Sequence, residues 1–195
     1  MIERITLDLD DCVFDSMPHL IGFMNWHFGR NLTMSDVWDF DLAKVYGMKT
    51  EDVIEAVREF YDSDFYGNAK SHDGDVEAVM VLKERFGKLP ALTSRPIEIL
   101  DKTWNEINAF YPSCFSQIYF ANSSNNNNPG VKKEEYLVSG NYGFFVEDNP
   151  EFARRVADLG IKVYMPKKFW NRNFSRHNFI TPVNGLKEVA KVFCC

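Results

Sequence analysis

The chain alternates short apolar runs with amphipathic ones over most of its 195 residues. Five apolar runs have the length and the aliphatic or aromatic content of buried strands, over residues 5–10, 89–92, 117–120, 144–146 and 161–164. Apolar residues at helical spacing predict helices over residues 75–86, 97–107, 132–139, 150–159 and 184–192, the first opened by Asp73 or Asp75. Strands that alternate with helices indicate an α/β fold with a parallel sheet covered on both faces.

Two segments depart from this alternation. Residues 123–130 are rich in asparagine and predict a polar surface loop. Residues 16–64 are helical in pattern and rich in aromatic side chains, and Thr50 resembles the N-cap of a helix within them. We therefore expect a small helical cap over residues 16–69, inserted after the first strand, and a core domain made of residues 1–15 and 70–195.

Composition and charge limit the classes of function that the chain can have. With 45% hydrophobic residues, the chain can build one full core and a small subdomain. A net charge of −6 does not suit the backbone of a nucleic-acid polymer, although local charges in a cleft can still hold a small anion. No apolar run approaches roughly 20 residues and no signal-peptide layout is present, so no membrane association is expected.

The cysteines indicate a reducing compartment. None of Cys12, Cys114, Cys194 and Cys195 lies in a CxxC pair or at the spacing of a zinc site. Structural disulfides are rare in the cytosol, so a cytoplasmic protein with free thiols is the expected setting. A homodimer is compatible with the sequence.

Three predicted strands end in short polar clusters, at residues 8–11 (DLDD), 93–95 (TSR) and 147–149 (EDN). Ligands of open parallel sheets bind beyond the carboxyl ends of the strands, so these clusters form the candidate site. Carboxylates that meet there repel one another unless a cation lies between them. Sites made only of oxygen ligands suit Mg2+, and the sequence therefore predicts a magnesium site.

The two aspartates of the first cluster suit a phosphoryl transfer. Strand alternation places Asp8 and Asp10 on the same side of the chain. One carboxylate can bind the metal and attack phosphorus, and the other can protonate the leaving oxygen and then activate water. A hydroxyl and a lysine would hold the remaining phosphate oxygens.

These clusters resemble the four motifs of the haloacid dehalogenase-like hydrolases. Residues 8–13 (DLDDCV) are similar to the first motif, and Thr93 stands in the place of the second. Residues 132–133 (KK) offer the lysine of the third motif, and residues 147–148 (ED) the acidic fourth. The motifs occur in the family's order and span most of the chain. The resemblance implies a three-layer α/β/α core with a small helical cap.

The resemblance also implies roles for the acidic residues. Asp8 would be the nucleophile that forms an aspartyl-phosphate. Asp10 would be the general acid and base, and would bind Mg2+ through its backbone carbonyl. Asp148 would complete the metal site together with Asp8, with Glu147 beside it.

By the same resemblance, Thr93 and Lys133 would bind the phosphate, with Ser94 next to them. Lys133 is preferred to Lys132 because its distance from Glu147 along the chain better matches the family. Thr93 and Ser94 could also cap the helix that follows them, and both roles can hold together because a helix N-terminus favours a phosphate.

Further segments are similar to the cytosolic 5'(3')-deoxyribonucleotidase branch, namely residues 93–96 (TSRP), 146–150 (VEDNP), 160–163 (GIKV) and 170–171 (WN). This resemblance implies a Mg2+-dependent phosphomonoester hydrolase whose substrates are nucleoside monophosphates. The departures are Asp11 in place of glycine, Cys12 in place of Thr or Val, and Ser16 where that branch has an aromatic that helps hold the base. The last change leaves a preference for pyrimidine deoxynucleotides open.

Other functions remain as alternatives. A phosphatase of sugar phosphates or other small metabolites would use the same chemistry with a different cap. A catalytically silent binding protein of the same fold is disfavoured, because such a protein has no need of four clustered carboxylates. Dehalogenase chemistry is disfavoured because Asp10 suits the protonation of an alkoxide leaving group.

Several residues also admit plain structural interpretations. Arg95 could contact a substrate or form a surface ion pair, and His72 is expected at a hinge or on the surface. Residues 170–171 could simply turn the chain, and residues 167–168 are expected in a solvated loop. Most cap aromatics are expected in the cap core while one or two could stack on a base, the candidates being Trp38, Phe40, Phe60, Tyr61, Phe65 and Tyr66.

Overall fold

The computed structural model describes residues 4–68, 70–72, 74–122 and 130–194. Residues 123–129 of the predicted polar loop lie outside the described residues, as do Asp73 and Cys195. In the part of the chain that is described, the longest helices have 12 residues, whereas roughly 20 are needed to cross a membrane.

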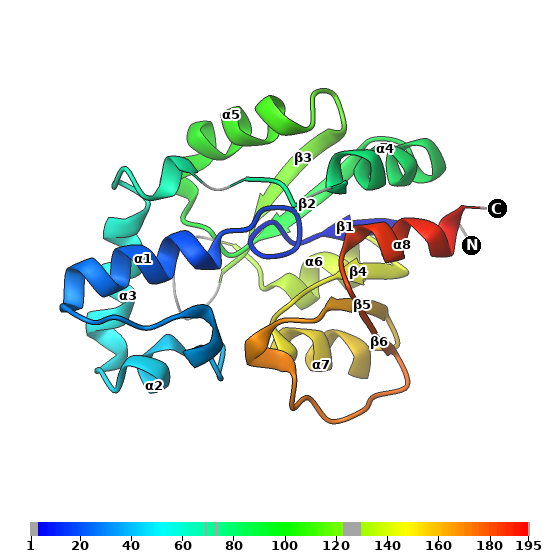
Figure 1. Ribbon diagram of the computed structural model, residues 1–195. Coiled ribbons are helices and arrows are strands. Elements are labelled where there is room, and N and C mark those ends of the chain that lie inside the picture. Colours follow the sequence, from blue (N-terminus) through cyan, green and yellow to red (C-terminus); the bar gives the residue numbers. More distant parts are fainter. Residues whose placement is uncertain (1–3, 69, 73, 123–129, 195) are drawn as a thin grey trace.

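A parallel sheet organises the core, with strand order β3-β2-β1-β4-β5-β6 (Figure 1). Its strands are β1 (Ile5–Leu7), β2 (Leu89–Thr93), β3 (Phe115–Phe120), β4 (Phe144–Val146), β5 (Lys162–Pro166) and β6 (Ile180–Val183). The predicted α/β fold is confirmed. Because β1 lies between β2 and β4, the carboxyl ends of these three parallel strands meet in the middle of one edge of the sheet.

Helices cover both faces of the sheet. On one face, α4 (Asp75–Phe86), α5 (Leu100–Phe110) and α8 (Leu186–Phe193) share a buried apolar cluster with β1 and β2. On the other, α6 (Lys133–Ser139) and α7 (Pro150–Asp158) pack with β4 and β5 into a second cluster. The three layers are helices, sheet and helices, and each helix contributes the apolar stripe that its sequence period predicts.

The segment between β1 and β2 forms a helical cap beside the core (Figure 1). Its helices are α1 (Met17–Phe28), α2 (Leu42–Tyr46) and α3 (Thr50–Phe60), with short 3-10 turns at η1 (Met34–Asp36) and η2 (Tyr66–Asn68). The cap has an apolar cluster of its own, which includes Phe23, Met24, Tyr46 and Phe60. Of the predicted cap aromatics, Phe60 and Tyr66 are buried in this cluster, and Trp38 is half exposed.

The strands differ from those predicted in two places. The first strand ends at Leu7 instead of continuing to Asp10, so the chain turns directly after the sheet edge and Asp10 forms a bridge with Phe14. The last strand, β6, was not predicted. Only Ile180 and Val183 of its four residues are buried and it contains Pro182, so it lacks an apolar run and suits the sheet edge where it lies.

Candidate active site

The polar clusters predicted at the strand ends are adjacent in the structure. Asp8 follows β1, Thr93 is the last residue of β2, and Glu147 and Asp148 follow β4. All four residues are buried, with at most 6% of their surface exposed. The parallel order β2-β1-β4 brings them together although they are up to 140 residues apart in sequence.

Lys133 supplies the positive charge beside Asp8. Its Nζ atom donates to Asp8 Oδ1 at 2.7 Å and to Glu147 Oε2 at 2.9 Å. Lys133 is 2% exposed and opens α6, whereas Lys132, the N-cap of that helix, is exposed. Burial raises the pKa of Asp8 to about 7, although the Lys133 ammonium opposes that rise. One ammonium is thus shared between two buried carboxylates.

Asp148 lies on the other side of Asp8 and has its own set of donors. Trp170 Nε1 donates to Asp148 Oδ2 at 2.9 Å, and Asn171 Nδ2 donates to the Asp148 backbone carbonyl at 2.9 Å. The Cys12 thiol lies 3.8 Å from Asp148 Oδ1. Burial, and then the nearby Asp8 carboxylate, raise the pKa of Asp148 to about 7. Trp170 and Asn171 therefore do more than turn the chain, because Trp170 orients this carboxylate and Asn171 holds the backbone that carries it.

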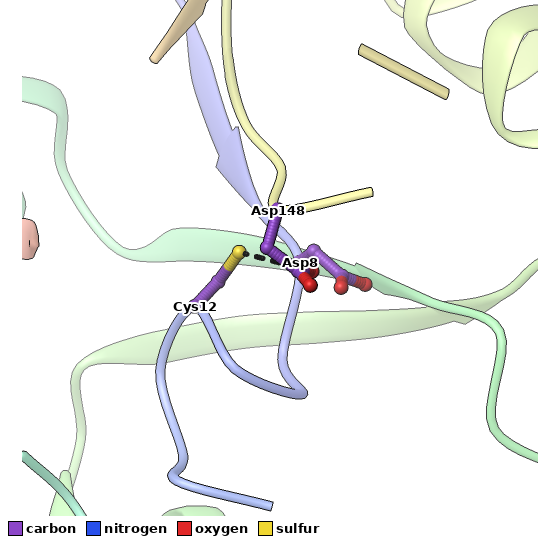
Figure 2. Close-up of side chains that lie close together, drawn as sticks. All are labelled: Asp8, Cys12 and Asp148. Carbon is purple, nitrogen blue, oxygen red and sulfur yellow. Dashed lines mark hydrogen bonds between the residues drawn. The ribbon is translucent and has the colours of Figure 1, made fainter. Parts of the chain in front are cut away.

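Asp8, Cys12 and Asp148 form a buried group whose ligand atoms lie within 4.8 Å of one another (Figure 2). The two carboxylates fit a hard divalent cation such as Mg2+. Burial raises the pKa of the Cys12 thiol well above its usual value, so this residue stays a neutral thiol and is a poor ligand for Mg2+. The group does not include the carboxylate of Glu147, which the sequence also proposed as a ligand, and the ligand predicted from Asp10 is its backbone carbonyl, which is not one of these side-chain atoms. Glu147 instead accepts from Lys133 and from the Asn149 backbone N–H.

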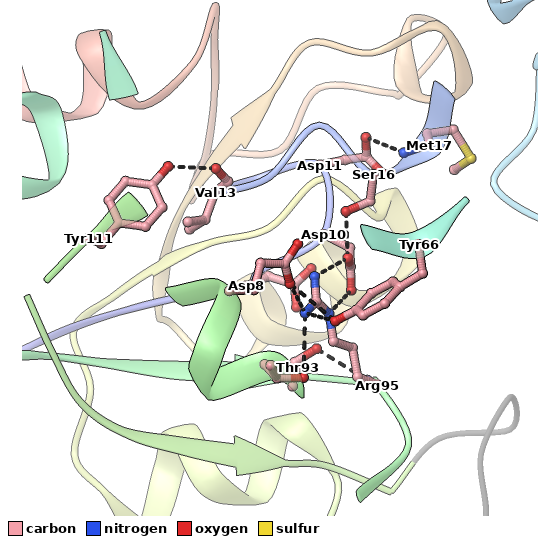
Figure 3. A network of polar contacts seen from close by, with 12 residues as sticks. Asp8, Asp10, Asp11, Val13, Ser16, Met17, Tyr66, Thr93, Arg95 and Tyr111 are labelled. Atoms are coloured by element: carbon pink, nitrogen blue, oxygen red, sulfur yellow. Dashed lines mark hydrogen bonds and ion pairs between the residues drawn. The ribbon is translucent and has the colours of Figure 1, made fainter. Parts of the chain in front are cut away.

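Asp10 has a different environment (Figure 3). Arg95 Nε donates to Asp10 Oδ2 at 2.9 Å, Arg95 Nη2 donates to Oδ1 at 2.7 Å, and Ser16 Oγ donates to Oδ1 at 2.6 Å. Burial by itself would raise the pKa of Asp10, but the Arg95 guanidinium and these hydrogen bonds outweigh it and lower the pKa. Ser16 therefore contacts the second aspartate directly.

Arg95 is the main functional-site residue that the sequence did not place. The expectation of a surface ion pair is wrong, because Arg95 is only 1% exposed. Its Nη1 atom also donates to the Tyr66 hydroxyl at 2.7 Å and to Glu106 Oε2 at 2.5 Å. The TSR run after β2 marked Arg95 as a candidate, but its partners are 85, 29 and 11 residues away, and no local pattern identifies them.

The hydroxyls after β2 occupy two different positions. Thr93 is fully buried, and its Oγ1 accepts from the Arg95 backbone N–H at 3.1 Å. Ser94 lines the cavity described below. The helical segment after them begins with a 3-10 turn, η3 (Ile97–Ile99), which has Pro96 as its N-cap and makes no side-chain capping bond.

Asp11 explains one departure from the family pattern. Its φ of 59° lies in the left-handed region, which favours glycine and is tolerated by aspartate. Asp11 Oδ1 accepts from the Met17 backbone N–H at 3.1 Å, which connects the turn after β1 to the start of α1. The position thus keeps the backbone conformation of a glycine while adding a carboxylate.

Lys168 lies deeper than the solvated loop expected for it. Its side chain is 15% exposed, and its Nζ lies 4.0 Å from Asp11 Oδ1 and 3.4 Å from His72 Nε2. His72 lies at the return from cap to core, 3.9 Å from Asp15. Its pKa is lowered by burial and by Lys168.

A cavity of about 1290 Å3 lies between the cap and the core, and the candidate site forms part of its wall. On the core side it is lined by Asp8, Asp10, Ser94, Lys133 and Asp148, among others. The cap contributes aromatic and charged side chains, including Trp38, Phe40, Arg58 and Tyr61. The arrangement can hold a small anion at the carboxylate–lysine end and a larger group against the cap.

Comparisons with known proteins agree with this architecture. No family model matches the sequence. Over 106 residues the chain is 30% identical to the curated protein of Halalkalibacterium halodurans named "Putative nucleotidase BH1399". That match covers 53% of each chain, so it spans about half the length of the relative.

Solved structures match over nearly the whole chain. The haloacid dehalogenase-like family hydrolase SP0104 from Streptococcus pneumoniae superposes with a TM-score of 0.71 at 15% identity, covering 98% of both chains. The "putative HAD-hydrolase YfnB" from Bacillus subtilis, solved bound to magnesium, has a TM-score of 0.62 at 12% identity and covers 100% of this chain and 99% of its own. At these identities the likeness shows the fold.

Proposed function

The chain has the haloacid dehalogenase-like hydrolase fold, and from it we propose that the protein is a Mg2+-dependent phosphomonoester hydrolase that acts on nucleoside monophosphates. The observation that carries the proposal is the arrangement around Asp8. The buried carboxylate of Asp8, at the carboxyl end of the central strand, contacts Lys133 and lies beside Asp148. It also lines the cavity under the cap.

In the proposed first step, an Asp8 oxygen attacks the substrate phosphorus in line with the ester oxygen. The bond from phosphorus to the ester oxygen breaks, and Asp10 donates a proton to the departing alkoxide. Because Arg95 favours the ionised form of Asp10, this step uses the form of the enzyme in which Asp10 carries the proton. The products are an alcohol and a phosphoryl group on Asp8. In the second step Asp10 takes a proton from water, the water oxygen attacks phosphorus, and Asp8 leaves as a carboxylate with inorganic phosphate released.

The side chains around Asp8 would hold the phosphate oxygens. Lys133 Nζ lies 2.7 Å from Asp8 Oδ1, so it can contact an oxygen of a phosphoryl group transferred to that carboxylate. Ser94 lies in the cavity wall, and Thr93 at the end of β2 would contribute its hydroxyl. Lys133 would also offset the charge that develops during transfer.

The carboxylates of Asp8 and Asp148 would hold the Mg2+ ion, with the Asp10 backbone carbonyl as the third protein ligand. When bound, Mg2+ offsets the charge of the transferring phosphoryl group and of the two carboxylates. Trp170 and Asn171 would keep Asp148 in place for this task. Glu147 would act by orienting Lys133.

The residues that line the cavity support a nucleoside monophosphate as the substrate. Its phosphate would lie at the Asp8 end, and the cap offers Trp38, Phe40 and Tyr61 as flat surfaces for a base. The half-length likeness to a protein named as a nucleotidase supports the same substrate class.

The test is phosphate release from a panel of nucleoside 5'- and 3'-monophosphates and sugar phosphates, with Mg2+ and with EDTA. We expect Mg2+-dependent release that is fastest with nucleotides. Release from sugar phosphates alone would keep the chemistry and overturn the substrate class. Equal release with and without EDTA would overturn the metal. No release from any substrate, with Mg2+ binding intact, would favour a silent binding protein.

A further inference from the structure

Arg95 joins the second aspartate to the cap. Its side chain has no exposed surface, and its donors reach three parts of the molecule. Its partners include Asp10 in the turn after β1, Tyr66 in η2 at the end of the cap, and Glu106 and Thr103 in α5 of the core. A buried guanidinium is costly unless its donors are paired, so these contacts hold one another in a fixed arrangement.

The contact with Asp10 depends on the shape of arginine. Nε and Nη2 donate to the two oxygens of the carboxylate, at 2.9 and 2.7 Å. This two-point contact fixes the plane of the carboxylate as well as its position. A lysine ammonium has the same charge but lacks two parallel N–H donors, so it cannot fix the plane of the carboxylate in the same way.

The Arg95 guanidinium contacts Asp10 and leaves part of the Asp10 carboxylate exposed to the cavity. The Asp10 side chain is 30% exposed and lines the cavity, whereas the Arg95 side chain is fully buried. Ser16 Oγ adds a third donor to the carboxylate, at Oδ1. Arg95 therefore does not reach substrate itself, and it acts on whatever Asp10 contacts in the cavity.

Tyr66 extends this network into the cap. Its hydroxyl accepts from Arg95 Nη1 at 2.7 Å and donates to Glu106 Oε2 at 3.1 Å. Its ring packs edge-on against Phe60 and Tyr61 of the cap. The orientation of Asp10 is thus connected to the far end of the cap through Arg95 and Tyr66, in addition to its direct contact with Ser16 at the start of the cap.

We propose that Arg95 is a positioning residue that holds the Asp10 carboxyl toward the leaving oxygen of the substrate, and that Tyr66 makes this positioning depend on the cap. The inference rests on the proposed function, in which Asp10 protonates the leaving alkoxide. It assigns to this pair the selective catalysis of esters whose leaving group needs a proton.

The test compares kcat/KM for two substrates of different leaving group. A nucleoside monophosphate releases an alkoxide that must be protonated, whereas p-nitrophenyl phosphate releases a stable phenolate. Because kcat/KM reports the steps up to leaving-group departure, it separates this role from the later hydrolysis. For Arg95→Lys we expect a fall of about 100-fold with the nucleotide and less than about threefold with p-nitrophenyl phosphate.

Four further variants, one of them a double variant, complete the experiment. Asp10→Asn should show the same selective loss, and adding Arg95→Lys to it should cost little more, because the two residues act as one unit. Arg30→Lys makes the same chemical change at an exposed cap position and should leave both substrates unaffected. Tyr66→Phe keeps the ring in the cap core and should give a selective loss of about tenfold with the nucleotide.

If Arg95 had only a structural role, Arg95→Lys would lower kcat/KM for both substrates by the same factor. That result would overturn the inference. If Arg95→Lys does not fold, Tyr66→Phe decides, because equal losses on both substrates there would also contradict the inference. A parent protein that is inactive on both substrates would overturn the proposed function and this inference with it. An active parent with unselective variants would overturn the inference alone.

Discussion

The two aspartates after β1 lie two residues apart but in opposite electrostatic surroundings. Arg95 contacts Asp10 with two donors, and this pairing lowers the Asp10 pKa. Asp8 receives one hydrogen bond from Lys133, an ammonium that also contacts Glu147, and its pKa is raised to about 7.

This difference indicates where a cation belongs. Asp10 and Glu106 share one guanidinium, so two carboxylates less one positive charge leave an excess of one negative charge there. Around Asp8 there are three buried carboxylates, those of Asp8, Glu147 and Asp148. Lys133 makes ion pairs with Asp8 and Glu147 and is the single lysine in hydrogen-bonding contact with this group. A divalent ion would restore the balance on the Asp8 side and has no comparable place beside Asp10.

Asp8→Asn should have the largest effect on activity. It removes the proposed nucleophile and keeps the size of the side chain, so turnover should fall by about four orders of magnitude or more. Steady-state phosphate release measures the loss, and circular dichroism checks the fold. Asp101→Asn, at an exposed position of α5, is the matched control. Substantial activity left in the Asp8 variant would sink the nucleophile assignment.

Lys133→Met tests the shared ammonium. It leaves Asp8 and Glu147 buried without their cation, so the free energy of unfolding in EDTA should fall by about 3–5 kcal/mol. Lys132→Met, one residue earlier and exposed, should change it by no more than about 0.5 kcal/mol. Denaturant unfolding measures both. If the account is right, added Mg2+ restores part of the lost stability, and no response to Mg2+ would argue against a cation beside Asp8.

Trp170→Phe acts on the Asp8 side alone. The variant keeps a ring in place and removes the hydrogen bond to Asp148 Oδ2, so Mg2+ should bind about 10- to 100-fold more weakly. The shift of the thermal midpoint with Mg2+ concentration, or calorimetry, measures this affinity. Trp26→Phe, at a tryptophan that is 70% exposed, is the control and should leave the affinity unchanged.

Asp75 extends the comparison to a buried carboxylate that makes no ion pair with a lysine or arginine among the described residues. It opens α4, is 3% exposed, and its Oδ2 accepts no hydrogen bond from the described residues. Burial raises its pKa from 3.8 to about 7, against the opposing effects of Lys168 and Lys187. The folded protein therefore binds this proton more tightly than the unfolded chain does.

By linkage, the contribution of Asp75 to stability declines as pH rises from 3.8 to about 7. Asp75→Asn mimics the protonated form, so its thermal midpoint should match the parent's at low pH and exceed it modestly above pH 7. Melting curves across this range test the effect. A constant difference between the two proteins at every pH would show that the carboxyl does not titrate in this way.

The sequence placed the residues of one region better than those of the other. That Asp8 and Asp148 would be neighbours followed from the rule that strand ends of a parallel sheet meet, which needs only the order of the elements. Lys133 was chosen through the family resemblance, and the roles of all three residues stay predictions. The contacts of Asp10 with Arg95, and of Arg95 with Glu106, depend on which way a turn and a helix face the core. Those orientations follow from tertiary packing, and an isolated charged residue gives no sign of them.

The fold itself shows the same limit. Long apolar runs such as β2, whose five residues are all buried, were predicted nearly to the residue. The edge strand β6 was missed because only two of its residues face the core. The roles of Trp170 and Asn171 were also underestimated, since their hydrogen bonds to Asp148 span more than twenty residues and follow from the loop after β5.

The most direct test of the central claim is to trap the phosphoryl group on Asp8. Protein mixed with a 32P-labelled substrate and Mg2+ is quenched in acid, and the label that stays with the denatured chain is counted and located by peptide mapping. We expect label on the peptide that contains Asp8, released by hydroxylamine as an acyl phosphate is, and absent from Asp8→Asn and from samples with EDTA. Turnover without any label on the protein, or an unchanged label in Asp8→Asn, would contradict the account.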